Sequence, residues 1–338
     1  MTLKVLVLCS LETGWDSVVS VAQQGAHIAA VIGLDHDSCD QDKVSGVFDV
    51  EKSCQKLGVS FIKVKDYSLR AREDKLAISA VSYDLIWVAG WQRLVPEWLI
   101  ESARMGVLGV HGSPDGISGG RGRSPQNWAL LLGCTRFDIA LFLIRKGVDD
   151  GPVILERSFF YNESDDIRSS YYKASLLISE MVLEVLNHPG RLCSARPQSG
   201  DSFYFPQRLP DDGRVDWFQP VSVIARHCRA LTRPYPGIRT KCNGIVLRVW
   251  QCQPFDDRMN GAVGQISTVF ADGCFLVNCA DGRLLVREWS SDDAQWEPFA
   301  NMLLESVPFL DQLSRVVERH TEKFPDQPVS DRICRLVI

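Results

Sequence analysis

The chain has 338 residues, 45% of them hydrophobic, and a net charge of −5 at pH 7. Its length exceeds the roughly 250–300 residues at which single cores stop growing, so two domains are expected. No apolar run approaches the ~20 residues that span a bilayer, and the first residues turn polar too early for a secretory signal. We therefore expect a cytoplasmic protein without membrane contact. The negative charge argues against a nucleic-acid partner, because proteins that grip a long polyanion normally present a basic face.

Eleven cysteines in a chain without a secretory signal indicate reduced thiols. No CxxC pair occurs, and the closely spaced Cys274 and Cys279 lack the nearby histidines that zinc would use. We expect these cysteines to be core residues and expect no metal site.

Short apolar, β-branched runs alternate with helix-length segments in the first half of the chain. The runs lie at 3–9, 27–33, 59–64, 83–90 and 106–112, and the helical segments at 15–25, 47–58, 72–82 and 95–104. Such alternation predicts a doubly wound, mostly parallel α/β sheet of Rossmann-like type. Residues 137–160 then predict a hairpin whose turn carries Asp149, Asp150 and Gly151.

After residue 200 the pattern changes to short alternating strands separated by Gly, Asn and Asp turns. This pattern is typical of a small antiparallel β domain of barrel type. From residue 296 onward the composition indicates helix. We therefore expect a catalytic domain at 1–200, a β-barrel domain at 201–295 and a helical tail at 296–338.

His111 and Asp149 are the leading candidates for catalysis. Ligands of doubly wound sheets bind beyond the carboxyl ends of the strands, where His111 is predicted to lie, and the acidic turn of the hairpin could meet it there. Alone, each residue is more typical of an ordinary core or turn position. A nearby carboxylate favours the cationic imidazole, which can donate to a developing oxyanion, while the carboxylate accepts a proton from an attacking amine. Together they favour acyl transfer to nitrogen without a covalent intermediate.

Two other interpretations of the Gly-rich run fit less well. The segment GISGG at 116–120 has the GxSxG spacing, but it lacks the preceding strand and directly following helix that expose a nucleophilic serine. The run also follows the fifth predicted strand rather than the first, where a dinucleotide-binding fingerprint would stand.

The order of these motifs resembles that of the formyltransferases that use 10-formyltetrahydrofolate, which include methionyl-tRNA formyltransferases and amino-sugar N-formyltransferases. The resemblance rests on His-Gly-Ser at 111–113, a Gly/Arg loop ending at Pro125, VDDGPVI at 148–154, and the long signature at 204–217 and 224–237. It covers about residues 1–295. It implies a Rossmann-like formyltransferase domain followed by an open, OB-like barrel.

The resemblance also implies roles for individual residues and 10-formyltetrahydrofolate as co-substrate. His111 and Asp149 are two of the family's three catalytic residues. The expected folate-binding residues are Gly90, Trp91, Gln92, Leu94, Val95, Arg145, Lys146, Gly147 and Val148. The residues expected to bind the acceptor are Ser113, Arg121, Arg123 and Ser124.

One departure from the family is Gly109. The family's third catalytic residue is an asparagine two positions before the histidine, and glycine has no side-chain donor. Losing one oxyanion donor costs about 100–1000-fold in rate in other enzymes. Either another donor substitutes, or the chain is a catalytically weak folate-binding or scaffold relative. The candidate donors are Arg121, Arg123, Ser124, Gln126 and Asn127.

The acceptor is expected to be a small or carrier-bound amine, such as an amino-sugar nucleotide or an aminoacyl carrier protein. Residues 33–50 are acidic where tRNA formyltransferases look basic, so initiator Met-tRNA is the alternative. Residues 309–331 resemble the start of adenylation domains of nonribosomal peptide synthetases, although a plain amphipathic helix explains them equally well. The sequence leaves open whether the chain forms a homodimer.

Overall fold

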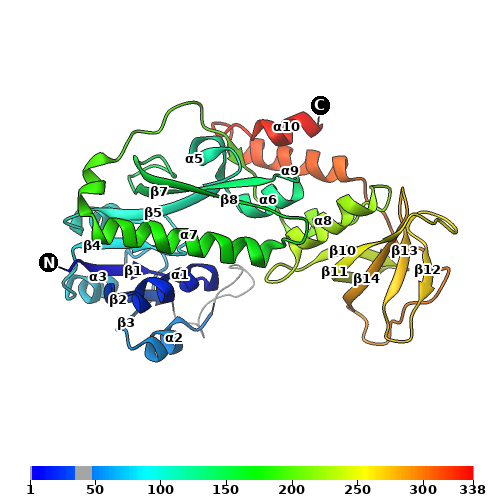
Figure 1. Cartoon of the computed structure of the whole chain (residues 1–338), viewed down its shortest axis with the longest axis horizontal. Coiled ribbons are helices and arrows are strands. Elements are labelled where there is room, and N and C mark those ends of the chain that lie inside the picture. Colours follow the sequence, from blue (N-terminus) through cyan, green and yellow to red (C-terminus); the bar gives the residue numbers. More distant parts are fainter. Residues whose placement is uncertain (1, 35–47, 338) are drawn as a thin grey trace. The chain divides into compact units, whose positions relative to one another are not determined.

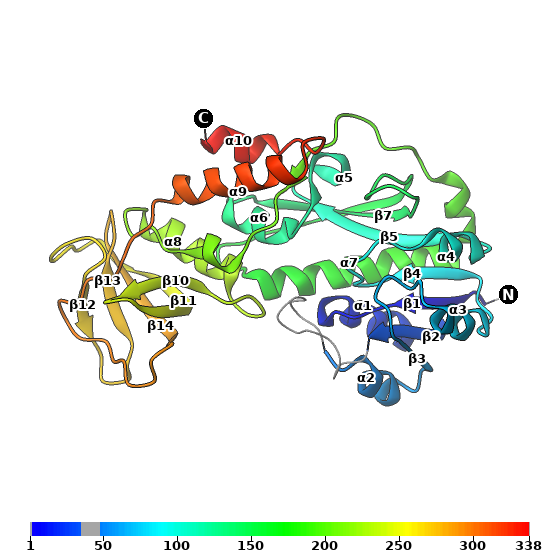
Figure 2. The ribbon, with the colours of Figure 1, turned by 180° about the vertical axis from the view of Figure 1, so that it is seen from behind.

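The computed structural model describes residues 2–34 and 48–337, so most of the acidic segment at 33–50 lies outside the described residues. The chain divides into two compact units (Figures 1 and 2). Unit 1 comprises Met1–Arg121, Arg136–Phe160 and Tyr171–Asp201, and unit 2 comprises Gly122–Thr135, Tyr161–Ser170 and Ser202–Ile338.

Unit 1 contains a seven-stranded sheet with the order β3-β2-β1-β4-β5-β7-β8. Its strands are β1 (Lys4–Leu8), β2 (His27–Leu34), β3 (Phe61–Val64), β4 (Leu85–Val88), β5 (Val107–Ser113), β7 (Arg136–Leu143) and β8 (Val153–Phe160). The strands β1 to β5 are parallel, whereas β7 and β8 run antiparallel at one edge. The prediction of a doubly wound, mostly parallel sheet is confirmed.

Helices bury both faces of this sheet. They are α1 (Glu12–Gln23), α2 (Val50–Leu57), α3 (Arg72–Ser79), α4 (Glu97–Ser102), α5 (Gly116–Gly119) and α7 (Ile167–Asn187). Leu6 and Leu8 of β1 join one core with Ile78 of α3 and Leu99 of α4. The intervening residues of β1 are equally inaccessible to solvent. Because successive strand residues face opposite sides, the sheet is covered on both.

The β7–β8 hairpin forms as predicted and ends in a turn that only glycine can complete. A Cβ on Gly151 would lie 1.7 Å from the carbonyl oxygen of Leu143, so no side chain fits at that position. Asp149, two residues earlier, has a backbone φ of +49°, in the left-handed region that aspartate tolerates better than most residues. The turn therefore holds Asp149 in one defined backbone conformation.

Unit 2 contains a five-stranded antiparallel sheet with the order β10-β11-β14-β13-β12. Its strands are β10 (Ile238–Cys242), β11 (Ile245–Asp256), β12 (Ile266–Val269), β13 (Phe275–Asn278) and β14 (Arg283–Ser291), and its helices are α6 (Pro125–Leu131), α8 (Val221–Leu231), α9 (Phe309–Lys323) and α10 (Asp331–Val337). The strands β6 (Arg121–Gly122) and β9 (Tyr204–Phe205) have two residues each. The predicted antiparallel β domain with C-terminal helices is confirmed, and the first of those helices begins at Phe309 rather than near 296.

No helix within residues 2–34 and 48–337 has both the length and the apolar character needed to cross a bilayer.

Candidate active site

His111 lies near the carboxyl end of β5, where a ligand of a parallel sheet would bind. Its Nε2 atom is 2.8 Å from the carbonyl oxygen of Gly120. Because a carbonyl oxygen can only accept, Nε2 carries a hydrogen and donates it in this arrangement. Only 10% of the His111 side chain is exposed. The imidazole is thus fixed in orientation by the Gly-rich loop that follows its strand.

Asp149 approaches the other ring nitrogen. Its Oδ2 atom lies 3.4 Å from Nδ1 of His111, and 27% of its side chain is exposed. Each ring nitrogen therefore lies beside an oxygen atom, Nε2 beside the carbonyl of Gly120 and Nδ1 beside the carboxylate of Asp149. The structure brings together the two residues that the sequence predicted as a catalytic pair.

Gln198 holds this arrangement together and was missed by the sequence analysis. Its Nε2 donates to the carbonyl oxygens of Asp149 (2.7 Å) and Gly151 (2.8 Å). Its Oε1 accepts from Nη2 of Arg121 (2.7 Å) and from Oγ of Ser118 (3.2 Å). One carboxamide thus joins the hairpin turn to the Gly-rich loop. The sequence carries no local pattern for it, because Gln198 follows the long helix α7 in an irregular segment.

Arg121 is the predicted acceptor-binding residue that lies with this group. Its side chain is buried, with 9% of the residue exposed, and its Nε atom has no hydrogen-bond partner. In the described part of the chain no carboxylate forms an ion pair with it. A guanidinium held in such surroundings is a ready partner for a negative charge.

Gly109 lies on the same face of β5 as His111, because alternate residues of a strand share a face. A Cβ at position 109 would meet Cγ1 of Ile144 at 2.7 Å and Cζ of Phe142 at 2.8 Å. Phe142 belongs to an apolar cluster with Ile117, Ala140 and Val153, against which Ile144 packs. Apolar side chains therefore occupy the space that an asparagine at position 109 would need.

The remaining predicted acceptor-binding residues have other surroundings. Ser113 is fully buried, and its Oγ accepts from the backbone N–H of Asp115 at 3.1 Å. Arg123 and Ser124 belong to unit 2, where the N–H of Arg123 donates to the carbonyl oxygen of Phe205 and Ser124 directly precedes α6.

The two predicted folate-binding loops, at 89–96 and 144–151, are connected in unit 1. Lys146 in the hairpin turn pairs with Glu97 at the start of α4, and this carboxylate raises the pKa of Lys146. Leu94 and Val148 expose their side chains, one in each loop. The other members of the first loop are held differently.

Trp91 and Val95 are buried in the core, and the N–H of Gln92 donates to the hydroxyl of Tyr67 at 2.9 Å. Gly90 has a φ of +92°. Arg145 and Gly147 lie with Lys146 in the hairpin turn. The first loop can therefore offer a ligand backbone groups and the exposed side chains of Arg93 and Leu94.

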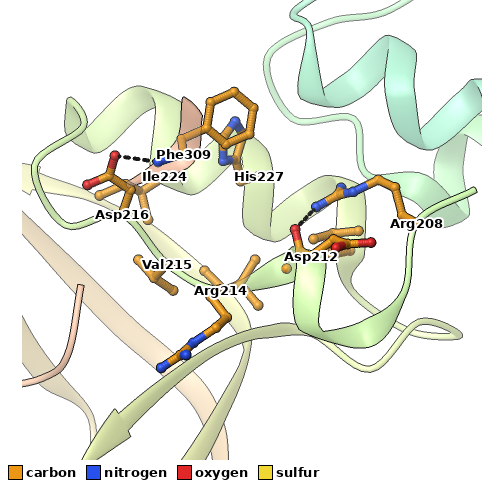
Figure 3. A pocket seen from close by; sticks show the side chains of 11 residues that line it. Arg208, Asp212, Arg214, Val215, Asp216, Ile224, His227 and Phe309 are labelled. Carbon is orange, nitrogen blue, oxygen red and sulfur yellow. Dashed lines mark hydrogen bonds between the residues drawn. The ribbon is translucent and has the colours of Figure 1, made fainter. Parts of the chain in front are cut away.

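A cavity in unit 2 is too small to serve as the substrate site instead (Figure 3). It is lined by residues that include Arg208, Asp212 and His227, and its free space of about 10 Å³ is near the minimum for one water. Burial, together with the cations Arg208 and Arg226, lowers the pKa of His227 to about 3. His227 is therefore neutral near pH 7.

No group of three or more His, Cys, Asp or Glu side chains within residues 2–34 and 48–337 could hold a metal ion. The ten cysteines in those ranges are free thiols.

Comparison with known proteins shows the family to which the chain belongs. Residues 4–185 match the family described as formyl transferase, and residues 209–303 match the formyl transferase C-terminal domain. A methionyl-tRNA formyltransferase of Geobacter metallireducens is 30% identical over 222 residues, which are 65% of this chain and 70% of that protein.

Two solved structures share the fold. HypX from Aquifex aeolicus in complex with tetrahydrofolic acid has a TM-score of 0.64 at 16% identity, covering 97% of this chain and 59% of HypX. This chain thus spans about three-fifths of the HypX length. An N-formyltransferase from Helicobacter canadensis, in complex with folinic acid and dTDP-3-aminofucose, has a TM-score of 0.53 at 13% identity, covering 85% of this chain and 99% of that one.

The matched domains account for most of the chain and occur in the family's order, with His111 and Asp149 brought together inside the first of them. The chain is therefore an enzyme of the formyl transferase family.

Proposed function

We propose that the chain moves the formyl group of 10-formyltetrahydrofolate to a primary amine of a small or carrier-bound substrate. The observation that carries the proposal is the His111–Asp149 pair, fixed at the end of β5 with Nδ1 and Oδ2 3.4 Å apart. A carboxylate beside an imidazole can take a proton from an attacking amine and pass it on, which is the proton chemistry that amide formation needs.

The reaction follows from these two side chains. The amine nitrogen forms a bond to the formyl carbon, and the carbonyl electron pair moves onto oxygen. Asp149 accepts the proton that the amine loses, and His111 shares that proton through Nδ1. When the electron pair on oxygen re-forms the carbonyl, the bond from the formyl carbon to N10 of the folate breaks. N10 then takes the proton held by Asp149 and His111. The products are the formamide and tetrahydrofolate.

The donor site is proposed at the loops 89–96 and 144–151. The Lys146–Glu97 ion pair joins them, and Leu94 and Val148 supply exposed apolar side chains for the flat rings of a folate. The structures of HypX and of the Helicobacter canadensis enzyme contain a folate, which supports a folate donor here. Arg123, Ser124 and Ser113 stay predictions for the acceptor.

Two acceptor classes compete. The curated relative from Geobacter metallireducens is a methionyl-tRNA formyltransferase, which favours tRNA. The Helicobacter canadensis enzyme is in complex with dTDP-3-aminofucose, which favours a small amine. The net charge of −5 gives the chain little electrostatic attraction for a polyanion, so we favour the small or carrier-bound amine.

The test is to incubate the purified chain with 10-formyltetrahydrofolate and a panel of amino-sugar nucleotides, aminoacyl carrier proteins, initiator Met-tRNA, and hydroxylamine as a generic nucleophile. We expect tetrahydrofolate to form and one acceptor to gain the mass of a formyl group. Thermal stabilisation by folinic acid without transfer to any member of the panel would instead identify a folate-binding relative that has lost catalysis.

A further inference from the structure

We infer that Arg121 is the catalytic group that stabilises the oxyanion, and that Gln198 is the residue that positions it. This inference rests on the proposed function, because it assigns the charge-stabilising role within that reaction. The family fills the role with an asparagine, and this chain has Gly109 at that position.

No side chain fits at position 109 without displacing its neighbours. A side chain there would have to displace both Ile144 and Phe142, whose carbon atoms lie within 2.8 Å of the Cβ position. Both ring nitrogens of His111 are also engaged, because Nε2 donates to the carbonyl oxygen of Gly120 and Nδ1 faces Asp149. The oxyanion therefore needs a donor from another part of the site.

Among the loop candidates, Arg121 belongs to unit 1 together with His111 and Asp149. The other candidates, Arg123, Ser124, Gln126 and Asn127, belong to unit 2, and Asn127 uses its Nδ2 to donate to the carbonyl oxygen of Ala230 at 2.6 Å. By contrast, the buried Nε of Arg121 has no partner. Arg121 also directly follows Gly120, the residue that holds the imidazole of His111.

Gln198 makes the position of Arg121 depend on that of Asp149. The carboxamide bonds Arg121 through its oxygen and the carbonyls of Asp149 and Gly151 through its nitrogen. An amide has two donor hydrogens and two acceptor lone pairs, and all four are used here with Ser118 included. Gln198 therefore fixes the guanidinium of Arg121 relative to the left-handed backbone of Asp149.

Burying a guanidinium without a carboxylate costs free energy that a structural residue would not be expected to incur. The negative charge that appears on the formyl oxygen during attack supplies the missing partner. An N–H of Arg121 donates to the oxyanion from the moment the amine–carbon bond forms until the bond to N10 breaks and the carbonyl is restored. Its contribution is therefore confined to the transition state, where stabilisation raises kcat.

The experiment compares Arg121→Met, Arg121→Lys, Gln198→Leu and Gln198→Glu with Arg104→Met, a control at an exposed arginine of unit 1. Kinetics are measured with 10-formyltetrahydrofolate and the acceptor found in the panel. Arg121→Met should lower kcat about 100–1000-fold while both KM values stay within about threefold. Arg121→Lys keeps the charge and should recover part of the rate. Gln198→Glu should also lower kcat, because its carboxylate would pair with the guanidinium.

Two further readouts separate catalysis from structure. Arg121→Met should melt at the wild-type temperature or above it, since it removes a buried charge, and it should leave the pH profile of kcat unchanged in shape. A large loss of thermal stability would make Arg121 a structural residue and overturn the inference. A raised KM for the acceptor with kcat intact would assign Arg121 to ground-state binding, which also overturns it.

Failure of the proposed function has a different signature. A wild-type chain that is stabilised by folinic acid yet transfers formyl to no amine would overturn that function and the role of Arg121 with it. An active wild type with an equally active Arg121→Met variant would overturn the role of Arg121 alone.

Discussion

Phe142 lies directly across the sheet from Gly109, and its ring occupies space that a side chain at position 109 would need. Ile144 closes the same space from the next position on that face. Apolar packing therefore fills the space at position 109 beside His111, and an asparagine does not fit there.

Replacing Gly109 by Asn should therefore destabilise the chain by about 1–3 kcal/mol, the usual cost of overpacking a filled core. It should bring no gain in kcat, because the amide has no room to reach the formyl oxygen. Urea unfolding and steady-state kinetics on the same preparation measure both effects. The double variant Gly109→Asn with Ile144→Ala, which opens space, is the matched comparison. A large rise in turnover for the single variant would show that the site tolerates the original donor.

Replacing His111 by Ala or Asp149 by Asn should each lower kcat by at least about 100-fold, because either change removes one end of the proton-sharing pair. Far-UV circular dichroism and the melting temperature should stay close to those of the wild type, since neither side chain belongs to the buried core of the sheet. The pair is wrongly assigned if either variant keeps wild-type kcat with the identified acceptor.

Gly151→Ala tests whether the hairpin turn sets the position of Asp149. The new Cβ would overlap the carbonyl oxygen of Leu143, so the turn has to open. We expect a lower melting temperature and a kcat loss comparable to that of Asp149→Asn. Gly190→Ala is the control, because a Cβ there meets nothing within 4 Å. Equal activity of the two alanine variants would mean that the turn does not control the carboxylate.

The stability of unit 2 should depend on pH through His227. Its folded-state pKa of about 3 lies below the unfolded value of about 6.5, so the unfolded chain binds a proton that the folded chain does not. The free energy of unfolding is therefore highest above pH 6.5 and should fall on acidification toward pH 3, by at most about 1.4 kcal/mol per pH unit.

His227→Phe removes this titration and keeps a ring to pack against Phe309, whose ring centroid lies 4.7 Å away. The variant should show a flatter decline between pH 7 and pH 5 in urea unfolding monitored by tryptophan fluorescence. His188→Phe, at an exposed position, is the control. Identical pH dependence of His227→Phe and wild type would rule out this source of acid sensitivity.

The sequence was sufficient to predict the elements whose signals are local. The strands β1 to β5 are mostly apolar runs, and His111 and Asp149 are chemically distinctive residues at a strand end and a turn. The helical tail was predicted too early, because Leu303 pairs with Gln265 and Pro308 directly precedes the start of α9. An apolar periodicity by itself does not distinguish such an extended segment from a helix.

The parts of the site that could not be predicted depend on contacts between distant residues. Gln198 bonds the Asp149 turn across 49 residues and Arg121 across 77, in a segment with no periodic pattern. The closure of position 109 likewise depends on side chains of β7 and the residue that follows it. Neither arrangement produces a recognisable pattern in the neighbouring sequence, so both are seen only in the folded structure.

The most direct test of the proposed function is a competition for one folate donor. The chain is supplied with 10-formyltetrahydrofolate at physiological salt, and kcat/KM is measured for initiator Met-tRNA and for the best small or carrier-bound amine. The account predicts a far higher kcat/KM for the small or carrier-bound amine and little change as salt is raised. Efficient formylation of the tRNA, with the steep salt dependence that phosphate contacts produce, would contradict it and assign the chain to translation initiation.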